Sequence, residues 1–164
     1  MEMPAELLEA FDRLHQEEQA EEPDNVPYTK SLEMRNRKMD ALSRGWNEVE
    51  KAAASFADAV KSELEAGARP DLDSAVLFLK GQEQRFRVAF SPKLQVEQEM
   101  QRAFFALPHA VRGRAVASNR RQIATYTRLL AGIRDLRLRL TELQALAQSS
   151  GDATGESSDF PGSP

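Results

Sequence analysis

Residues 39–60 read MDALSRGWNEVEKAAASFADAV, and this stretch decides the fold class. Its apolar side chains recur at alternating steps of three and four residues, the spacing of a helix that pairs with another helix. They are Met39, Leu42, Trp46, Val49, Ala53, Phe56 and Val60. Outward from this seam, Thr29 or Ser31 suits the N-cap and Gly67 suits the C-terminal stop. The pattern therefore predicts one long helix over 29–66, in which Gly45 either weakens the helix or makes room for a neighbour.

A second long helix is predicted over 109–148, where the apolar positions drift slowly around the helix and imply packing along most of its length. These positions are Val116, Ile123, Tyr126, Leu130, Ile133, Leu136, Leu140, Leu143 and Ala147. Gly113 and Gly132 weaken this helix locally. Between the two long helices, shorter helical segments are predicted at 71–90 and 92–107, and Pro92 either kinks the chain or restarts a helix.

The two ends of the chain differ from its centre. Near the N-terminus, Leu7, Phe11 and Leu14 share one face of a predicted acidic amphipathic helix. The two prolines that follow break that helix, and the Gly-, Ser- and Asp-rich C-terminal end predicts a disordered tail. The predicted division is an N-terminal helix at 1–22, a linker at 23–28, a helical bundle domain at 29–148 and a tail at 149–164.

Together these patterns predict an all-α fold. We expect an elongated antiparallel helical bundle or hairpin of coiled-coil-like long helices, with a short N-terminal helical arm and the disordered tail. The composition agrees, because 41% hydrophobic, 7% aromatic and 29% charged residues are typical of long helices. Since the seams include many alanines, we expect a thin core that benefits from a dimer or another partner.

Charge is distributed unevenly along the chain, although the net charge is only -4. Residues 1–25 carry nine acids against the single base Arg13, whereas residues 112–139 carry eight arginines against the single acid Asp135. This polarity either serves an external partner or lets one part of the protein pack on another part or on a second copy.

Little in the sequence indicates catalysis. The chain has no cysteine, its two histidines His15 and His109 have no ligand-type partner at helical spacing, and no glycine-rich nucleotide motif occurs. We therefore expect no enzyme activity, no metal site and no cofactor. Without a secretory signal or a long apolar run, a soluble protein of the cytoplasm is expected, which the absence of cysteine also fits.

A set of apolar side chains is predicted to contact protein partners. The N-terminal stripe behind its linker resembles a helix-in-groove ligand or a swapped arm, and the seam around Trp46 suits a core or an interface. Adjacent Phe104 and Phe105 differ by about 100° around a helix, so one of them is expected to approach the surface or a partner. The predicted interaction residues are Leu7, Phe11, Leu14, Met39, Leu42, Trp46, Val49, Phe56, Phe104 and Phe105.

Four arginines form a stripe on the last helix, because steps of seven, seven and eleven residues return to nearly the same face. They are Arg114, Arg121, Arg128 and Arg139. The stripe is suited to nucleic-acid phosphate, an acidic helix or anionic lipid, or alternatively to the acidic N-terminal region of the same chain. A second basic cluster at 30–38 would lie at the far end of an antiparallel hairpin.

The function predicted from these features is that of a non-enzymatic helical adaptor, assembly or chaperone-like protein. It would act through helix–helix contacts with protein partners and self-associate as a homo-oligomer, such as a dimer, through residues 39–60 and 116–147. The alternative is a nucleic-acid-associated regulatory protein that uses the arginine stripe, although a pI near 5.3 is unusual for that class.

Overall fold

The structure is a computed structural model that describes residues 1–20, 26–106 and 108–159, except for the side chains of residues 29, 105, 109–111 and 150–159. The predicted all-α fold is confirmed, and no strand occurs in those ranges. The elements are α1 (Ala5–Gln19), α2 (Tyr28–Glu65), α3 (Asp73–Ala103), a short 3-10 helix η1 (Phe104–Ala106) and α4 (His109–Asp159).

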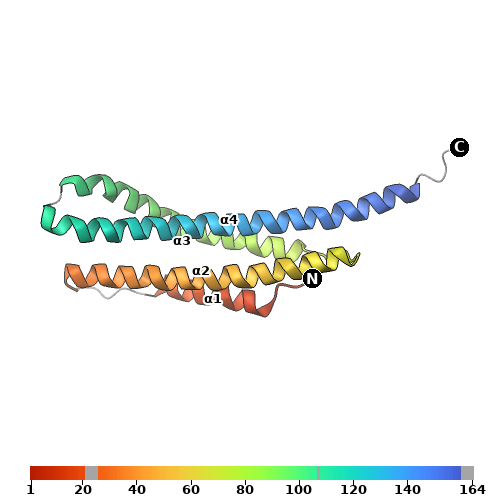
Figure 1. Cartoon of the computed structure of the whole chain (residues 1–164), viewed down its shortest axis with the longest axis horizontal. Coiled ribbons are helices and arrows are strands. Elements are labelled where there is room, and N and C mark those ends of the chain that lie inside the picture. Colours follow the sequence, from red (N-terminus) through yellow and green to blue (C-terminus); the bar gives the residue numbers. More distant parts are fainter. Residues whose placement is uncertain (21–25, 107, 160–164) are drawn as a thin grey trace.

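The helices form an elongated bundle of two antiparallel hairpins, α1 with α2 and α3 with α4, which pack together through α2 and α4 (Figure 1). Arg121 bonds Asp40 and Arg128 bonds Asn47, so both pairs keep the same offset in sequence and α2 runs parallel to α4. The predicted bundle is confirmed, but its two longest helices are not an antiparallel pair. Short connections make sequence neighbours antiparallel, and alternate helices are therefore parallel.

The predicted boundaries around the second connection are confirmed. Gly67 has a φ of 86°, a left-handed conformation that suits glycine at the end of α2. The backbone N–H of Ala68 donates to the Glu63 carbonyl at 2.9 Å, and the backbone N–H of Asp73 donates to Asp71 Oδ1 at 3.0 Å. Pro92 does not restart a helix, because it lies inside the single helix α3.

An aromatic cluster occupies the centre of the core. The ring of Phe86 on α3 meets four other rings edge to face, with centroids 5.4–6.2 Å apart. These rings belong to Phe11 and His15 of α1, Trp46 of α2 and Phe90 of α3. Phe90 in turn stacks on Tyr126 of α4, so the cluster joins all four long helices.

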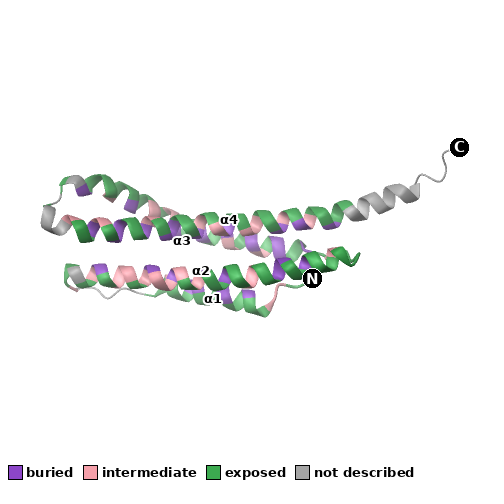
Figure 2. Cartoon of the chain, viewed as in Figure 1, coloured by how far each residue is buried: buried purple, intermediate pink, exposed green. Residues whose placement is uncertain are grey.

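The N-terminal helix is part of this core and is not detached from it (Figure 2). Leu7, Phe11 and Leu14 are each at most 1% exposed. A Cβ at Gly45 would lie only 3.0 Å from Leu14 Cδ1, so the glycine of α2 makes room for α1, as one of the two interpretations of its sequence position predicted.

The buried face of α4 changes character along the helix. From Tyr126 onward it is apolar, but before Tyr126 it buries polar side chains, while the predicted Val116 and Ile123 are only half-buried. The buried polar residues are Ser118, Asn119, Gln122 and Thr125. Asn119 Nδ2 donates to Glu97 Oε2 at 2.8 Å and to the Glu97 carbonyl at 2.7 Å. These bonds offset the cost of burying the Asn119 amide nitrogen, and the face of α4 that is buried here differs from the predicted one.

At the other end, the helix α4 continues to Asp159, whereas its side chains are described only as far as Ser149. Nearly all of the tail predicted at 149–164 therefore lies outside the described side chains, and its disorder stays a prediction.

Candidate functional site

Helix α1 covers only part of the length of the bundle, because it is much shorter than its neighbours (Figure 1). Lys38 Nζ donates to the carbonyl of Ala20 at 3.1 Å, which marks where α1 ends against α2. Beyond this point α2 continues over residues 28–37 and α3 over residues 94–103. We call this part, together with the start of α4, the three-helix half.

A groove of about 390 Å³ begins where α1 stops and opens on the three-helix half. Each of the three remaining helices lines it. The lining residues are Arg35 and Lys38 of α2, Pro92, Lys93, Val96 and Glu97 of α3, and Gln122 and Tyr126 of α4. The groove thus lies in the lane that α1 would follow if it were longer.

The groove combines cationic walls with apolar surface. Arg35 is half-buried and, within the described ranges, has no ion pair, while Lys93 Nζ lies 3.7 Å from Glu18 Oε1 of α1. Val96 is 52% exposed in spite of its apolar side chain. Among the lining residues, the single carboxylate of Glu97 stands against three basic side chains, so the described lining carries a net positive charge.

The parallel arrangement of α2 and α4 gathers positive charge at this end. The described residues 26–44, 93–103 and 108–121 carry eleven of the 22 lysines and arginines but only four of the 26 acids. The bases are Lys30, Arg35, Arg37, Lys38, Arg44, Lys93, Arg102, Arg112, Arg114, Arg120 and Arg121, and the acids are Glu33, Asp40, Glu97 and Glu99. Glu17 and Glu18 of α1 lie beside Arg44 and Lys93, and with these two acids counted the described residues of this end remain net positive. The two basic clusters, expected at opposite ends, therefore share one end.

The arginine stripe is partly engaged inside the chain. Arg121 pairs with Asp40, and Arg128 donates to Asn47 Oδ1 at 2.5 Å and lies 3.5 Å from Glu50 Oε1. The partners belong to α2 and not to the acidic N-terminal region that the sequence suggested. Arg114 lies exposed at the three-helix half, and Arg139 lies exposed beside α1 and α2 towards the other end.

The predicted interaction residues lie in the chain's own core. Besides the three residues of α1, the members of the α2 seam are all buried, namely Met39, Leu42, Trp46, Val49 and Phe56. Phe104 is also buried, at 8% exposure, and the side chain of Phe105 is not among those described. In this conformation the α2 seam has no surface left for a partner, and an interface through it stays a prediction.

A larger hollow of about 470 Å³ lies at the tip of the three-helix half. Its lining includes Phe104, Arg112, Val116 and Arg120. This hollow borders residues whose side chains are outside the description.

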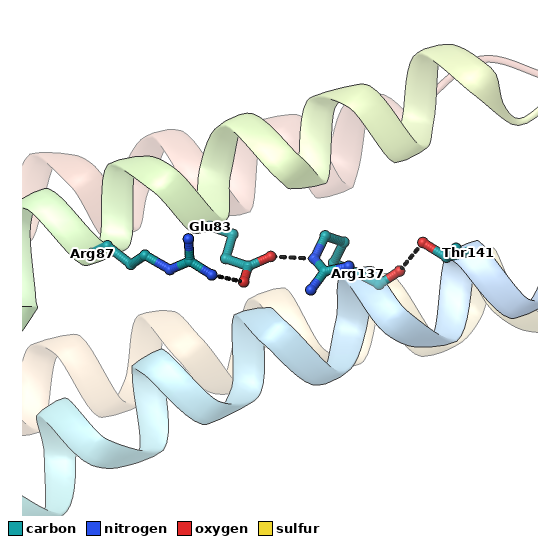
Figure 3. A network of polar contacts seen from close by, with 4 residues as sticks. All are labelled: Glu83, Arg87, Arg137 and Thr141. Carbon is teal, nitrogen blue, oxygen red and sulfur yellow. Dashed lines mark hydrogen bonds and ion pairs between the residues drawn. The ribbon is translucent and has the colours of Figure 1, made fainter.

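An ion-pair network between α3 and α4 is a feature that the sequence patterns do not reveal (Figure 3). Glu83, only 5% exposed, accepts from Arg87 NH2 at 2.6 Å and from Arg137 Nε. Thr141 Oγ1 donates to the carbonyl of Arg137 at 2.8 Å. A carboxylate removed from water in this way needs its cationic partners, because an unpaired buried charge is strongly destabilising.

Replacing Arg137 with methionine is therefore expected to lower the free energy of unfolding. Breaking a buried pair costs about 3–5 kcal/mol. Because the Arg137 side chain is 23% exposed and Glu83 keeps Arg87, we expect a smaller loss of about 1–2 kcal/mol. Urea unfolding measures the loss. The double variant Glu83→Leu with Arg137→Met removes both charges and should recover most of it, and no recovery would contradict this account.

His15 of α1 is buried against α3. Its Nε2 lies 2.6 Å from Gln82 Oε1, to which the neutral ring donates, while Nδ1 is buried without a described partner. Burial lowers the pKa of His15 below its ordinary value, and the charge of Arg85 lowers it further. The bond to Gln82 and the charges of Glu18 and Asp12 act in the opposite direction.

Stability is consequently expected to fall as the pH decreases. The folded-state pKa of His15 lies below the unfolded value of about 6.5, so its contribution is complete above that pH and is lost below it. The slope cannot exceed about 1.4 kcal/mol per pH unit for one group. Urea unfolding between about pH 7.5 and 5 measures the loss. His15→Gln should flatten this part of the curve while His109 is retained, and an unchanged slope would contradict the assignment.

Comparisons with known proteins do not assign this chain to a protein class. Neither a protein-family model, nor a curated protein, nor a solved structure matches the chain. Within the described ranges, no three His, Cys, Asp or Glu side chains gather in a way that could hold a metal ion. None of the described helices combines the length and the apolar character needed to cross a membrane.

Proposed function

We propose that this chain is a non-enzymatic helical adaptor or assembly protein that binds a protein partner through helix–helix contacts. The observation that carries the proposal is the groove at the end of α1, where, among the described residues, three helices continue without a fourth beside them. A helix buries its apolar face most readily against other helices, so an open position in a bundle suits a helical ligand.

We also propose that the protein resides in the cytoplasm, which the absence of cysteine from the sequence supports. Self-association is a further part of it. Because the α2 seam is buried within the chain, a dimer in this conformation would use other surfaces, such as the face of α3 where Leu77 and Val88 are 70% and 68% exposed.

Photo-crosslinking in cells tests the adaptor function directly. A benzophenone amino acid at Val96, in the groove, is expected to capture a recurrent protein that mass spectrometry identifies. The same group at Leu146 of α4 is the matched control, since at 57% it is about as exposed but lies outside the groove. Equal capture at both positions would contradict docking at the three-helix half. A chain that crosslinks to no protein and stays a monomer in native mass spectrometry would contradict the adaptor function.

Nucleic-acid binding is a second candidate, supported by the gathering of both basic clusters at one end. Phosphate contacts release counterions, so affinity for a duplex or single strand should fall steeply with salt. Reversing Arg114 and Arg120 to glutamate should weaken binding, whereas reversing Arg139, away from the three-helix half, should not. Absence of binding at low ionic strength, or equal effects of these changes, would remove this candidate.

A further inference from the structure

We infer that the outer face of α3 is a docking surface for an amphipathic helix of a partner protein, one that carries acidic residues beside its apolar stripe. The inference goes beyond the proposed function, which rests on the groove at the end of α1, and gives the adaptor a second contact surface. It follows from a line of uncharged side chains on α3 and from the bases that flank this line.

The uncharged side chains run along the exposed face of α3. They follow each other at alternating steps of three and four residues, the spacing at which one helix contacts another. We call this line the α3 seam, and its members are Ser74, Leu77, Gly81, Gln84, Val88, Ser91 and Gln95. All are exposed except the half-buried Ser91. The seam is about 32 Å long, which is room for about three heptads of a partner helix.

Another helix can cover the α3 seam at little cost. Removing a charged side chain from water is expensive unless it is paired, and the seam contains no charge. Leu77 and Val88 are 70% and 68% exposed, more than any other large apolar side chain in the described ranges, and they gain by being covered. At Gly81, between them, a Cβ would meet nothing within 4 Å, so a large side chain of a partner can approach the backbone there.

The charges beside the α3 seam are of one sign. Over residues 74–96, α3 carries four bases and a single acid, Glu83, although acids outnumber bases in the whole chain. Glu83 is buried and already bound by two arginines, so it does not offset the surface charge (Figure 3). The exposed bases Lys80, Arg85 and Arg87 lie on the two sides of the seam. Lys80 and Arg85 have no ion pair within the described ranges.

The two flanks of the α3 seam differ in strength. Arg85 lies on the side of α1, where Asp12 offsets part of its charge, since both residues influence the charge of His15. Arg87 lies on the side of α4, because it shares Glu83 with an arginine of that helix. Lys80, one heptad before Arg87, is on the same side, which is therefore the more strongly basic flank.

These charges favour a partner protein over a second copy of the chain. The two-fold axis of a dimer places identical faces together, so the bases of one copy would meet the same bases of the other. Like charges across an interface are unfavourable, and the dimer contact considered above is thus the less favourable use of this face. A helix with acids on both sides of its apolar stripe would instead pair with the flanking bases, as partner helices do in coiled coils.

The exposure of the α3 seam does not depend on undescribed residues. The segment 21–25 begins beyond the pair of Glu18 and Lys93, past the seam residues 74–91, and the start of α2, to which it connects, lies farther away still. At the other end, Gln144 of α4 bonds the start of α3. Helix α4 continues from there for about fifteen residues, a length of about 22 Å that the last five residues of the chain cannot span in return.

The test uses the full chain and a fluorescein-labelled synthetic peptide of about three heptads, with leucine at the a and d positions and glutamate at e and g. Anisotropy at low ionic strength is expected to show binding to the unaltered protein. Lys80→Glu with Arg85→Glu should weaken binding about tenfold or more. The matched control is Lys51→Glu with Lys61→Glu, which reverses two exposed bases of α2, changes the net charge equally and should stay within about twofold.

Two further comparisons separate the seam from general charge attraction. Leu77→Ser should weaken binding of the glutamate peptide about fivefold, whereas Leu146→Ser on α4, where the side chain is 57% exposed, should stay within about twofold. A peptide with lysine in place of glutamate should bind the variant Lys80→Glu with Arg85→Glu better than the unaltered protein.

Several results would overturn the inference. These are no binding of the glutamate peptide, equal losses with the two double variants, or no effect of Leu77→Ser. A dimer in native mass spectrometry that Leu77→Ser dissociates would assign the seam to a second copy and overturn it as well. Circular dichroism verifies that each variant folds, and Lys80→Gln with Arg85→Gln repeats the test if the glutamate variant does not fold.

The outcome at the α3 seam is distinguishable from that at the groove. Capture of a protein at Val96 in cells without peptide binding at the seam would leave the adaptor function standing and refute docking on α3. Peptide binding that depends on Lys80 and Arg85, without capture at Val96, would support the seam and contradict the groove.

Discussion

Replacing Phe86 with alanine is expected to lower the free energy of unfolding by about 3–5 kcal/mol, the range for removing a fully buried aromatic ring. Phe86 is 0% exposed. Its ring contacts Phe11 of α1, Trp46 of α2 and Phe90 of α3, so the cavity would open between the two hairpins where no single helix can collapse into it. Urea unfolding followed by circular dichroism measures the loss.

Phe78→Ala is the matched control for this prediction, because it is the same change on the same helix. Phe78 is half-buried and its ring meets Phe11 at 5.6 Å. Its loss should cost about 1–2 kcal/mol. If the Phe86 variant does not fold, Phe86→Leu preserves most of the volume and should show a smaller loss with the same sign. Equal losses for Phe78→Ala and Phe86→Ala would contradict the central role of Phe86.

Gly132→Ala is expected to destabilise the protein by about 2–3 kcal/mol, although alanine is the better helix former by about 1 kcal/mol. A Cβ at Gly132 of α4 would lie 2.3 Å from Trp46 Cζ2 and 2.6 Å from Cε2. The indole is fully buried against α4 and cannot move without disturbing the aromatic cluster. Thermal and urea unfolding measure the change, and the emission of this single tryptophan reports on the local repacking.

Gly81→Ala is expected to have the opposite effect and to stabilise the protein. Gly81 lies on the exposed face of α3, and a Cβ there would meet nothing within 4 Å. The helix propensity of alanine should therefore raise the free energy of unfolding by up to about 1 kcal/mol. The double variant Trp46→Phe with Gly132→Ala should lose less than the sum of the single changes, because the smaller ring leaves room for the methyl group. Stabilisation by Gly132→Ala would refute the close packing of α2 on α4.

Local features of the helices were predictable from the sequence, because they depend on neighbours along the chain. The seam from Met39 to Val60 is buried apart from its half-buried Ala53, and Gly67 ends α2 as its position predicted. Features that depend on which helices become neighbours were not predictable in the same way. Gly132 looked like a weak point of its helix, and only the parallel placement of α2 beside α4 shows that it accommodates Trp46.

The groove and the buried polar groups were missed for a related reason. A polar run at 118, 119, 122 and 125 follows helical spacing, but polar side chains at such positions normally face water. The bonds that hold Asn119 in the core come from Glu97 on another helix. Glu83 and Arg137 likewise lie 54 residues apart. The groove depends on the mismatch in length between α1 and α2, so it could be located only after α1 was known to pack in the core.

Binding of a partner at the three-helix half would also affect how long the protein survives in a cell. Besides a few apolar side chains its helices bury polar groups, and the aromatic cluster lies outside it, so we expect this end to unfold locally more readily than the rest. A ligand that binds only the folded form raises its stability by mass action, and proteolysis in cells often follows the population of opened chains. Binding of the proposed partner there would therefore protect the folded protein, and the amount of this chain in a cell would then follow the amount of that partner.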